Sequence, residues 1–285
     1  MAKVEHDALT GKDTTGHEWD GIKELNNPLP KWWLYVFYAT ILWGVVYTVV
    51  YPSWPTLNDY WGGVLGYSSR AEHRADLAKA VADRAVWAEK FRNRDIGEIV
   101  KDPELLNYAM AGGASIFADN CAACHGAGGQ GQGFFPVLAD DDWLWGGTLE
   151  DIEQTIAYGI RSGHDDGRES EMPSFGADEL LTKEEIELVA SYVAGLSNGG
   201  SVAGPGADIF EEQCSGCHGE DGKGGRDFGA PNLTDGIWLY GGSKKAIAAQ
   251  VNKPRHGVMP IFTDRLDEVA IKQVAIYVHT RGGGE

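Results

Sequence analysis

The sequence lacks any excess of positive charge. Its 24 Lys and Arg residues are outnumbered by 42 Asp and Glu residues, which gives a net charge of −18 over 285 residues. We therefore expect no nucleic-acid partner, because binding to phosphates requires clustered Lys and Arg side chains. Apolar residues make up 43% of the chain, which argues against disorder. The length is enough for about two domains.

Cysteine is also scarce, and its placement is informative. The four cysteines all belong to two Cys-x-x-Cys-His motifs, "CAACH" at 121–125 and "CSGCH" at 214–218. No cysteine remains for a disulfide framework.

Charge is absent from residues 32–51, which read almost entirely as apolar and aromatic. Twenty such residues match the ~20 that a helix needs to cross ~30 Å of hydrocarbon. Trp and Tyr residues crowd both ends of the run, as they do at membrane interfaces. A cleaved signal peptide fits less well, since the run starts late and no small-residue cleavage site follows. We expect a permanent transmembrane helix over 32–51.

The lysines near this segment predict its orientation. Lys23 and Lys31 precede it closely, whereas no Lys or Arg follows until Arg70. The positive-inside rule then places a polar N-terminal arm, 1–31, in the cytoplasm and everything after the helix in the periplasm. Residues 52–107 are expected to form a periplasmic spacer that is mainly one helix, since 68–95 show helical periodicity.

The remainder of the chain is an internal duplication. Three pairs of segments align, at offsets of 93, 95 and 87 residues: 112–125 with 205–218, 136–147 with 231–242, and 172–175 with 259–262. Both copies have helical patterns at their ends, with Thr182 and Asp267 as N-cap candidates, and neither shows strand-like alternation. The prediction is a mainly α protein with two tandem, contiguous domains, 108–197 and 198–285, joined by a glycine-rich linker.

Three kinds of site compete for a Cys-x-x-Cys pair. A zinc site would combine the two pairs, but 89 residues separate Cys124 from Cys214, where zinc modules have about 15–20. A thioredoxin-like dithiol would follow a strand, and neither alternative requires a histidine after the second cysteine. Covalent haem c does, because the thiols add to the two vinyl groups and the histidine binds the iron. The sequence thus predicts two haem c groups, each with its own attachment set: Cys121, Cys124 and His125 for the first, Cys217, Cys214 and His218 for the second.

Each iron needs a sixth ligand or an open site, and methionine is the candidate. Met172 and Met259 occupy equivalent positions, each before a proline, although a lone methionine is ordinarily core filler. We assign Met172 to the iron bound by His125 and Met259 to the iron bound by His218. His164 and His256 are rival donors, but they do not align with each other, which favours surface histidines.

Two prolines follow the haem histidines after short loops. The carbonyl groups of Pro136 and Pro231 are candidates to accept the ring N–H of His125 and His218, respectively. Such a bond would orient the ligand ring toward the iron.

The negative charge is concentrated in one part of the chain. Residues 108–197 contain 16 acidic and 3 basic side chains, while the flanking regions are nearly balanced. One interpretation is a solvated surface that keeps the domain soluble. The other is a docking face for a basic donor cytochrome c, since a field of one sign steers encounters.

Taken together, the chain resembles the dihaem cytochrome c subunit (subunit III) of cbb3-type cytochrome c oxidases. The family-specific stretch is "TGHEWDGIKELNNPLPKWWLYVFYATILWG" at 15–44. The resemblance implies two class I cytochrome c domains in a bacterial inner-membrane complex, alongside a haem–copper catalytic subunit and a monohaem cytochrome c subunit. Electrons from a donor cytochrome c would pass through both haems toward the haem–copper subunit, where oxygen reduction drives proton pumping. This chain would have no active site of its own.

Other functions share the same haem chemistry. The chain could be a free membrane-anchored dihaem carrier, or the cytochrome subunit of a periplasmic dehydrogenase, and only the N-terminal stretch argues against these. A dihaem peroxidase would need a vacant sixth position on one iron, and two Met-Pro pairs argue against that.

Overall fold

The computed structural model describes residues 3–197, 199–200 and 203–282. It divides into two compact units, Met1–Asp83 and Arg84–Glu285, and each is described by itself below. Some of the predicted features lie outside the described residues. They are the domain boundary expected at 197/198, the expected C-terminal end at 285, and residues 198, 201 and 202 of the expected linker.

A small antiparallel sheet forms the N-terminal arm, to which the sequence reading assigned no structure. It has the order β1–β2–β3, with β1 at His6–Asp7, β2 at Lys12–Trp19 and β3 at Ile22–Leu25. Asp20 and Gly21 connect β2 to β3 with φ angles of 49° and 83°. Two positive φ angles are typical of the tight turn that matches the twist of a hairpin, and Asp-Gly is its usual sequence. That dipeptide was the signal from which the hairpin could have been found.

The apolar run forms helix α1, Lys31–Val50, one residue earlier than predicted. None of its residues is buried, and it is long and apolar enough to span a membrane. Side chains this apolar are stable on an exposed face only if lipid surrounds them, so the structure agrees with the expected anchor. Tyr51 caps the C-terminal end of the helix, directly before Pro52.

The predicted spacer helix is α2, Ser69–Arg92. Its C-terminal end lies in the second unit, where Trp87 stacks on Tyr108 with ring centroids 5.2 Å apart, and Phe91 meets the same ring edge-on at 5.5 Å. Phe91 is fully buried. The end of the spacer therefore belongs to the core that follows it.

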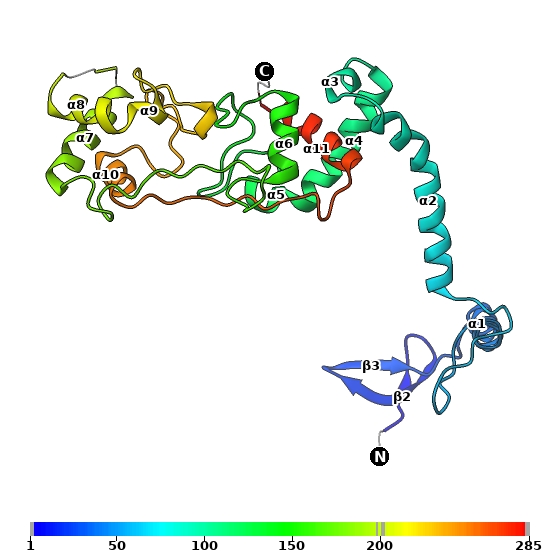
Figure 1. The fold of residues 1–285 in the computed structure, drawn as a ribbon. Coiled ribbons are helices and arrows are strands. Elements are labelled where there is room, and N and C mark those ends of the chain that lie inside the picture. Colours follow the sequence, from blue (N-terminus) through cyan, green and yellow to red (C-terminus); the bar gives the residue numbers. More distant parts are fainter. Residues whose placement is uncertain (1–2, 198, 201–202, 283–285) are drawn as a thin grey trace. The chain divides into compact units, whose positions relative to one another are not determined.

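Two hydrophobic cores make up the second unit (Figure 1). The helices of the first core are α3 (Ile96–Ile99), α4 (Pro103–Asn120), α6 (Leu149–Tyr158) and α11 (Glu268–His279). The helices of the second are α7 (Lys183–Leu196), α8 (Pro205–Gln213) and α10 (Lys244–Asn252). Two single-turn helices carry the cysteine motifs, α5 (Ala122–His125) and α9 (Ser215–His218), and a 3₁₀ turn, η1, covers Arg226–Phe228.

The C-terminal helices of the two repeats are exchanged between these cores. Helix α11 packs on α4 and α6, while α7 packs on α8 and α10, as Figure 1 shows. Contiguous packing of the expected domains, 108–197 and 198–285, would instead place α7 in the first core and α11 in the second. The second core is built from one uninterrupted stretch of chain, and the first core is completed only when the chain returns after α10. The short connection from α7 to α8 favours this arrangement, because consecutive helices joined by few residues usually pack together.

Equivalent glycines allow each helix pair to approach closely. A Cβ atom on Gly113 of α4 would lie closer than 3.0 Å to the backbone oxygen of Gln273 on α11. Its repeat partner, Gly206 of α8, is blocked in the same way by the backbone of Leu188 on α7. The two halves thus use the same packing, with the C-terminal helices crossed over.

Both predicted N-caps of the crossed helices are present. Thr182 and Glu185 form a reciprocal capping box at the start of α7. At the start of α11, the Asp267 carboxylate accepts a hydrogen bond from the backbone N–H of Ala270 at 2.8 Å.

Candidate haem-binding sites

Each Cys-x-x-Cys-His motif sits where a longer helix ends. Cys121 is the last residue of the turn that closes α4, and the N–H of His125 donates to its carbonyl oxygen at 2.9 Å. The bond from His218 to Cys214 is 3.0 Å long. One helical turn places residues i and i+3 on the same side, so the two thiols of each motif face one ligand.

The ring of each motif histidine is fixed by the predicted carbonyl. Nδ1 of His125 lies 3.0 Å from the oxygen of Pro136, and Nδ1 of His218 lies 3.1 Å from the oxygen of Pro231. With the Nδ1 proton used in this bond, Nε2 keeps its lone pair for a metal. Burial lowers the pKa of both histidines against the opposing effect of the hydrogen bond, which favours the neutral, metal-binding ring.

The cysteines do not have the character of a redox dithiol. Burial, with a smaller contribution from the neighbouring thiol, raises the pKa of Cys121 and of Cys214 to about 11. A catalytic Cys-x-x-Cys pair needs the opposite shift, because the thiolate is the reactive form. The described part of the chain also has no cluster of three or more His, Cys, Asp or Glu side chains arranged to hold a metal ion. The raised pKa of the thiols weighs against the dithiol alternative.

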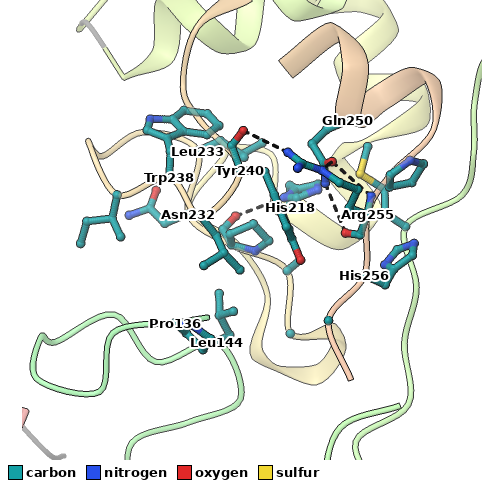
Figure 2. Close-up of a pocket in the computed structure, with 18 of the residues that line it drawn as sticks. Pro136, Leu144, His218, Asn232, Leu233, Trp238, Tyr240, Gln250, Arg255 and His256 are labelled. Carbon is teal, nitrogen blue, oxygen red and sulfur yellow. Dashed lines mark hydrogen bonds between the residues drawn. The ribbon is translucent and has the colours of Figure 1, made fainter. Parts of the chain in front are cut away.

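A cavity of about 490 Å³ opens beside the second motif. Cys214, Cys217 and His218 line it, and Figure 2 shows the His218 ring among the side chains of Trp238, Tyr240 and Arg255. Its walls are mainly apolar; they include Phe175, Val189, Val193, Phe210, Leu233, Ile247 and Val251. A pair of thiols, an imidazole and apolar walls form the donor set and the surroundings that haem c requires, and the volume lies within the range of cofactor pockets.

Met172 lies at this cavity, together with His218. It lines the cavity and packs against the second core, which includes Cys214. The residues after it are held by α10, since the N–H groups of Gly176 and Ala177 donate to the carbonyl of Asn252 at 3.2 and 3.0 Å. The expected pairing of Met172 with His125 is therefore not what the packing brings together.

Met259 lies on the other core. It packs against the first core, as Cys121 does. Its backbone pairs with Ile160 through two hydrogen bonds of 3.0 Å, and the N–H of Phe262 donates to the carbonyl of Ala157 at 3.2 Å. Met259 thus shares a core with Cys121 of the first motif, whereas the expected pairing was with His218. The reason is the exchange of the terminal segments, which carries each methionine with its helix.

The two rival histidines differ in position. His164 stacks on Tyr158 with ring centroids 4.8 Å apart, and its Nδ1 accepts a hydrogen bond from the N–H of Asp166 at 3.0 Å. These contacts fit a surface histidine. His256 lines the cavity of His218 and so competes with Met172 as a sixth donor there. Met110 packs against the first core.

The sequence reading missed two arginines at the edges of the cavity. Arg161 and Arg255 occupy equivalent positions in the repeats, within "IRSG" and "PRHG", and both line the cavity. Alignment of the two repeats could therefore have identified this pair of arginines. The Arg255 guanidinium lies 4.4 Å from the ring of Phe134. It lies 4.7 Å from the ring of Tyr240, which Figure 2 shows beside it. Phe134 belongs to the first repeat, so this contact joins the two repeats beside the cavity.

Family models match both the N-terminal part of the chain and its two repeats. Residues 11–58 match the N-terminal domain of cytochrome oxidase-cbb3, FixP, and residues 109–193 and 202–278 match cytochrome c oxidase, cbb3-type, subunit III. The cbb3-type cytochrome c oxidase subunit FixP of Sinorhizobium medicae is 50% identical, over 98% of this chain and 97% of its own length. The FixP subunit of Azorhizobium caulinodans is 52% identical over 98% and 96%, and the CcoP subunit of Azospirillum brasilense is 48% identical over the whole of both chains. The chain therefore belongs to the family of subunit III of cbb3-type cytochrome c oxidases.

Proposed function

We propose that this chain carries two haem c groups and passes electrons through them from a donor cytochrome c to the catalytic subunits of its oxidase. As a family member it is a membrane-anchored, electron-transfer cytochrome c subunit of a cbb3-type oxidase. The observation that carries the proposal is the distribution of the two motifs and the two methionines between the cores: Cys121 and Met259 pack against the first, and Cys214 and Met172 belong to the second.

In this proposal the ligand sets are crossed. The haem attached to Cys121 and Cys124 is bound by His125 and Met259. The haem attached to Cys214 and Cys217 is bound by His218 and Met172. This pairing replaces the one expected from sequence order, and the distribution of the methionines between the two cores supports it.

The protein groups then have distinct tasks in electron transfer. The haem iron supplies the one-electron chemistry. The thiols tether the group, and the carbonyls of Pro136 and Pro231 hold the histidine rings at the distances given above. A methionine thioether raises the reduction potential and keeps small molecules from the iron. These roles suit transfer of electrons better than binding of a substrate.

The finer assignments of place and partner follow from the same proposal. We place the arm 1–31 in the cytoplasm and both haem sites in the periplasm of a bacterial inner membrane, as the lysines before α1 favour. The haem–copper subunit and a monohaem cytochrome c subunit would be the neighbours within the complex. Oxygen reduction and proton pumping would belong to the haem–copper subunit.

Purification from membranes under native conditions tests this proposal. We expect two haems per chain by pyridine haemochrome assay, haem staining of the denatured chain, and copurification with a haem–copper subunit. One haem per chain would contradict the dihaem assignment. A dihaem chain that purifies alone, or with a periplasmic dehydrogenase, would instead support the alternative of a separate electron carrier.

The site of donor docking needs revision because the terminal helices are exchanged. Residues 108–164 contain seven acidic side chains and one basic one, while 165–197 contain nine and two. Within the second group, the loop at 165–169 is hydrogen-bonded to α6 of the first core, whereas α7 belongs to the second core. The negative charge attributed to one domain is thus shared by the two cores, and its part near the haem at Cys214 and Cys217 includes the carboxylates of α7 and of the segment before it.

We expect electron transfer from a basic donor cytochrome c to slow as salt is added, since exposed charges are screened beyond about 10 Å at 0.1 M ionic strength. Replacing the exposed carboxylates Asp178 and Glu184 with amides should weaken this salt dependence. The matched control replaces Asp119 and Asp141, which are also exposed, and should weaken it less. Rates measured by stopped flow that are independent of salt would contradict acidic docking.

A further inference from the structure

A three-residue segment, Gly159–Arg161, is hydrogen-bonded to both methionine segments, by which we mean residues 168–172 and 257–259. On one side Ile160 pairs with Met259 through the two 3.0 Å hydrogen bonds described above. On the other side the N–H of Arg161 donates to the carbonyl of Arg168 at 2.8 Å, and the N–H of Arg168 donates to the carbonyl of Gly159 at 3.0 Å. Arg168 precedes Met172 by four residues. The two methionines, which lie on different cores, are therefore attached to one short piece of backbone.

The Arg161 side chain holds the same two segments a second time. Its Nε donates to the carbonyl oxygen of Gly257 at 2.7 Å, and its Nη1 donates to that of Ser170 at 3.0 Å. Gly257 precedes Met259 by two residues, and Ser170 precedes Met172 by two residues. The guanidinium group is planar and carries its donors in a fixed geometry, so it fixes the separation of the two carbonyls.

The backbone of Arg161 is held in an unfavourable conformation. Its φ angle is 51°, in the left-handed region that suits glycine. Among the described residues, the other non-glycine residues with positive φ are Asp20 and Glu179, both exposed, whereas Arg161 is half-buried. Such a conformation persists only where the surrounding contacts require it, and it often marks a functional position. Here the conformation aims the guanidinium at both carbonyls.

The repeat provides an internal comparison. Arg255 is the equivalent of Arg161, but its guanidinium makes only 3.5 Å contacts with Gln250 and the Tyr240 carbonyl, besides the two aromatic rings. It does not reach either methionine segment through a described hydrogen bond. Hydrogen bonding of one arginine side chain to both methionine segments is therefore a property of Arg161 and not of the repeated motif.

We propose that Arg161 is a positioning residue for both axial methionines, through which the ligation of one haem is coupled to that of the other. This inference rests on the proposed crossed ligation. It requires that loss of the Arg161 side chain weaken two bonds at the same time, that of Met259 to the first haem and that of Met172 to the second. A residue that only bound a haem propionate at the cavity would affect one haem.

The variant that isolates the side chain is Arg161→Gly. Glycine accepts the φ of this position without strain, so the backbone has no reason to rearrange and the fold is expected to persist. Arg161→Lys keeps the charge but loses the planar guanidinium group. Its effects on both haems should be intermediate between those of Arg161→Gly and wild type. Arg265→Gln is the matched control, because that guanidinium lies over the Phe262 ring, 4.9 Å from its centre, near the same methionine segment.

The readouts are the long-wavelength iron–sulfur charge-transfer band of the oxidised protein, carbon monoxide binding to the reduced protein, and a redox titration resolving both haems. For Arg161→Gly we expect a weaker band, carbon monoxide binding at both haems and lower potentials for both, with Arg265→Gln unchanged. A change at one haem alone, or at neither, would overturn the proposal. Thermal unfolding and haem content show whether the variant is folded, and if it is not, Arg161→Lys decides by the same criteria.

Failure of this inference is distinct from failure of the proposed function. If wild type contains two methionine-ligated haems and Arg161→Gly behaves like wild type, only the coupling role is lost. If wild type lacks the iron–sulfur band, the ligand assignment itself is lost, whatever the Arg161 variants do.

Discussion

Replacing Met172 with alanine is expected to lower the reduction potential of the haem attached to Cys214 and Cys217. The fall should be on the order of 0.1 V or more, because axial ligands set haem potentials over a range of roughly 0.8 V. The thioether that favours reduced iron is lost, and the open position should bind carbon monoxide. The haem attached to Cys121 and Cys124 should change little, since Met172 lies in the second core. Met259→Ala should produce the opposite pattern.

The two haems must be distinguished for this measurement. Replacing Cys124 with alanine leaves one vinyl group of the first haem unreacted, which shifts its visible absorption and labels it. In this background, Met172→Ala should open the unlabelled haem and Met259→Ala the labelled one. The reverse pattern would restore the ligand pairing expected from sequence order.

His256 provides a further control, because it lines the same cavity as Met172. If it binds the iron when Met172 is removed, the single variant will stay closed to carbon monoxide but will still have a lowered potential. The double variant Met172→Ala, His256→Gln should then open. If His256→Gln alone lowered the potential while Met172→Ala did not, the histidine would be the native ligand.

Replacing Gly113 with alanine is expected to destabilise the first core by about 1–3 kcal/mol, the usual cost of overpacking. The new methyl group would meet the backbone oxygen of Gln273 and the Cβ of Tyr277, neither of which can move without shifting α11. The lost contact is between helices, so the thermal unfolding midpoint should fall even though alanine is the better helix former. The free energy of unfolding, measured on the haem-loaded chain, checks this.

Gly112 is the matched control, one residue earlier in the same helix. A methyl group there meets only the end of the Gln273 side chain and no backbone atom, but this side chain is buried and donates to the Tyr108 carbonyl at 3.3 Å. Gly112→Ala should therefore cost less than Gly113→Ala, about 1 kcal/mol or less, because the weakened hydrogen bond is offset by the gain in helix propensity. Equal stabilities for the two variants would show that α4 and α11 do not approach each other as described.

Much of this protein could be predicted from local sequence because the physical cause is local. The apolar run is long enough for a membrane span wherever it lies, and Thr182 and Asp267 cap helices through neighbours three residues away. The cysteine motifs and the prolines that follow them act within 11 or 13 residues, so the bonds of His125 and His218 were foreseeable. The hairpin at Asp20 and Gly21 was equally local and could have been predicted.

The partner of each methionine was not local and could not be predicted in this way. The two repeats present near-identical helix faces, with Gly113 and Phe117 on α4 matching Gly206 and Phe210 on α8. Tyr277 of α11 contacts Phe117 with ring centroids 5.5 Å apart, and Tyr192 of α7 contacts Phe210 at 5.3 Å. Since either C-terminal helix suits either partner, the pattern of residues allows both pairings.

The sequence by itself predicted the anchor, the duplication and the chemistry proposed for each Cys-x-x-Cys-His motif. Only the tertiary structure decided which methionine shares a core with which Cys-x-x-Cys-His motif. The physical reason is chain connectivity: a short connection keeps α7 beside α8, and α11 must then close the core that α4 began. Met172 and Met259 follow their helices to opposite cores, and Arg161 lies at the point where the two methionine segments are held together.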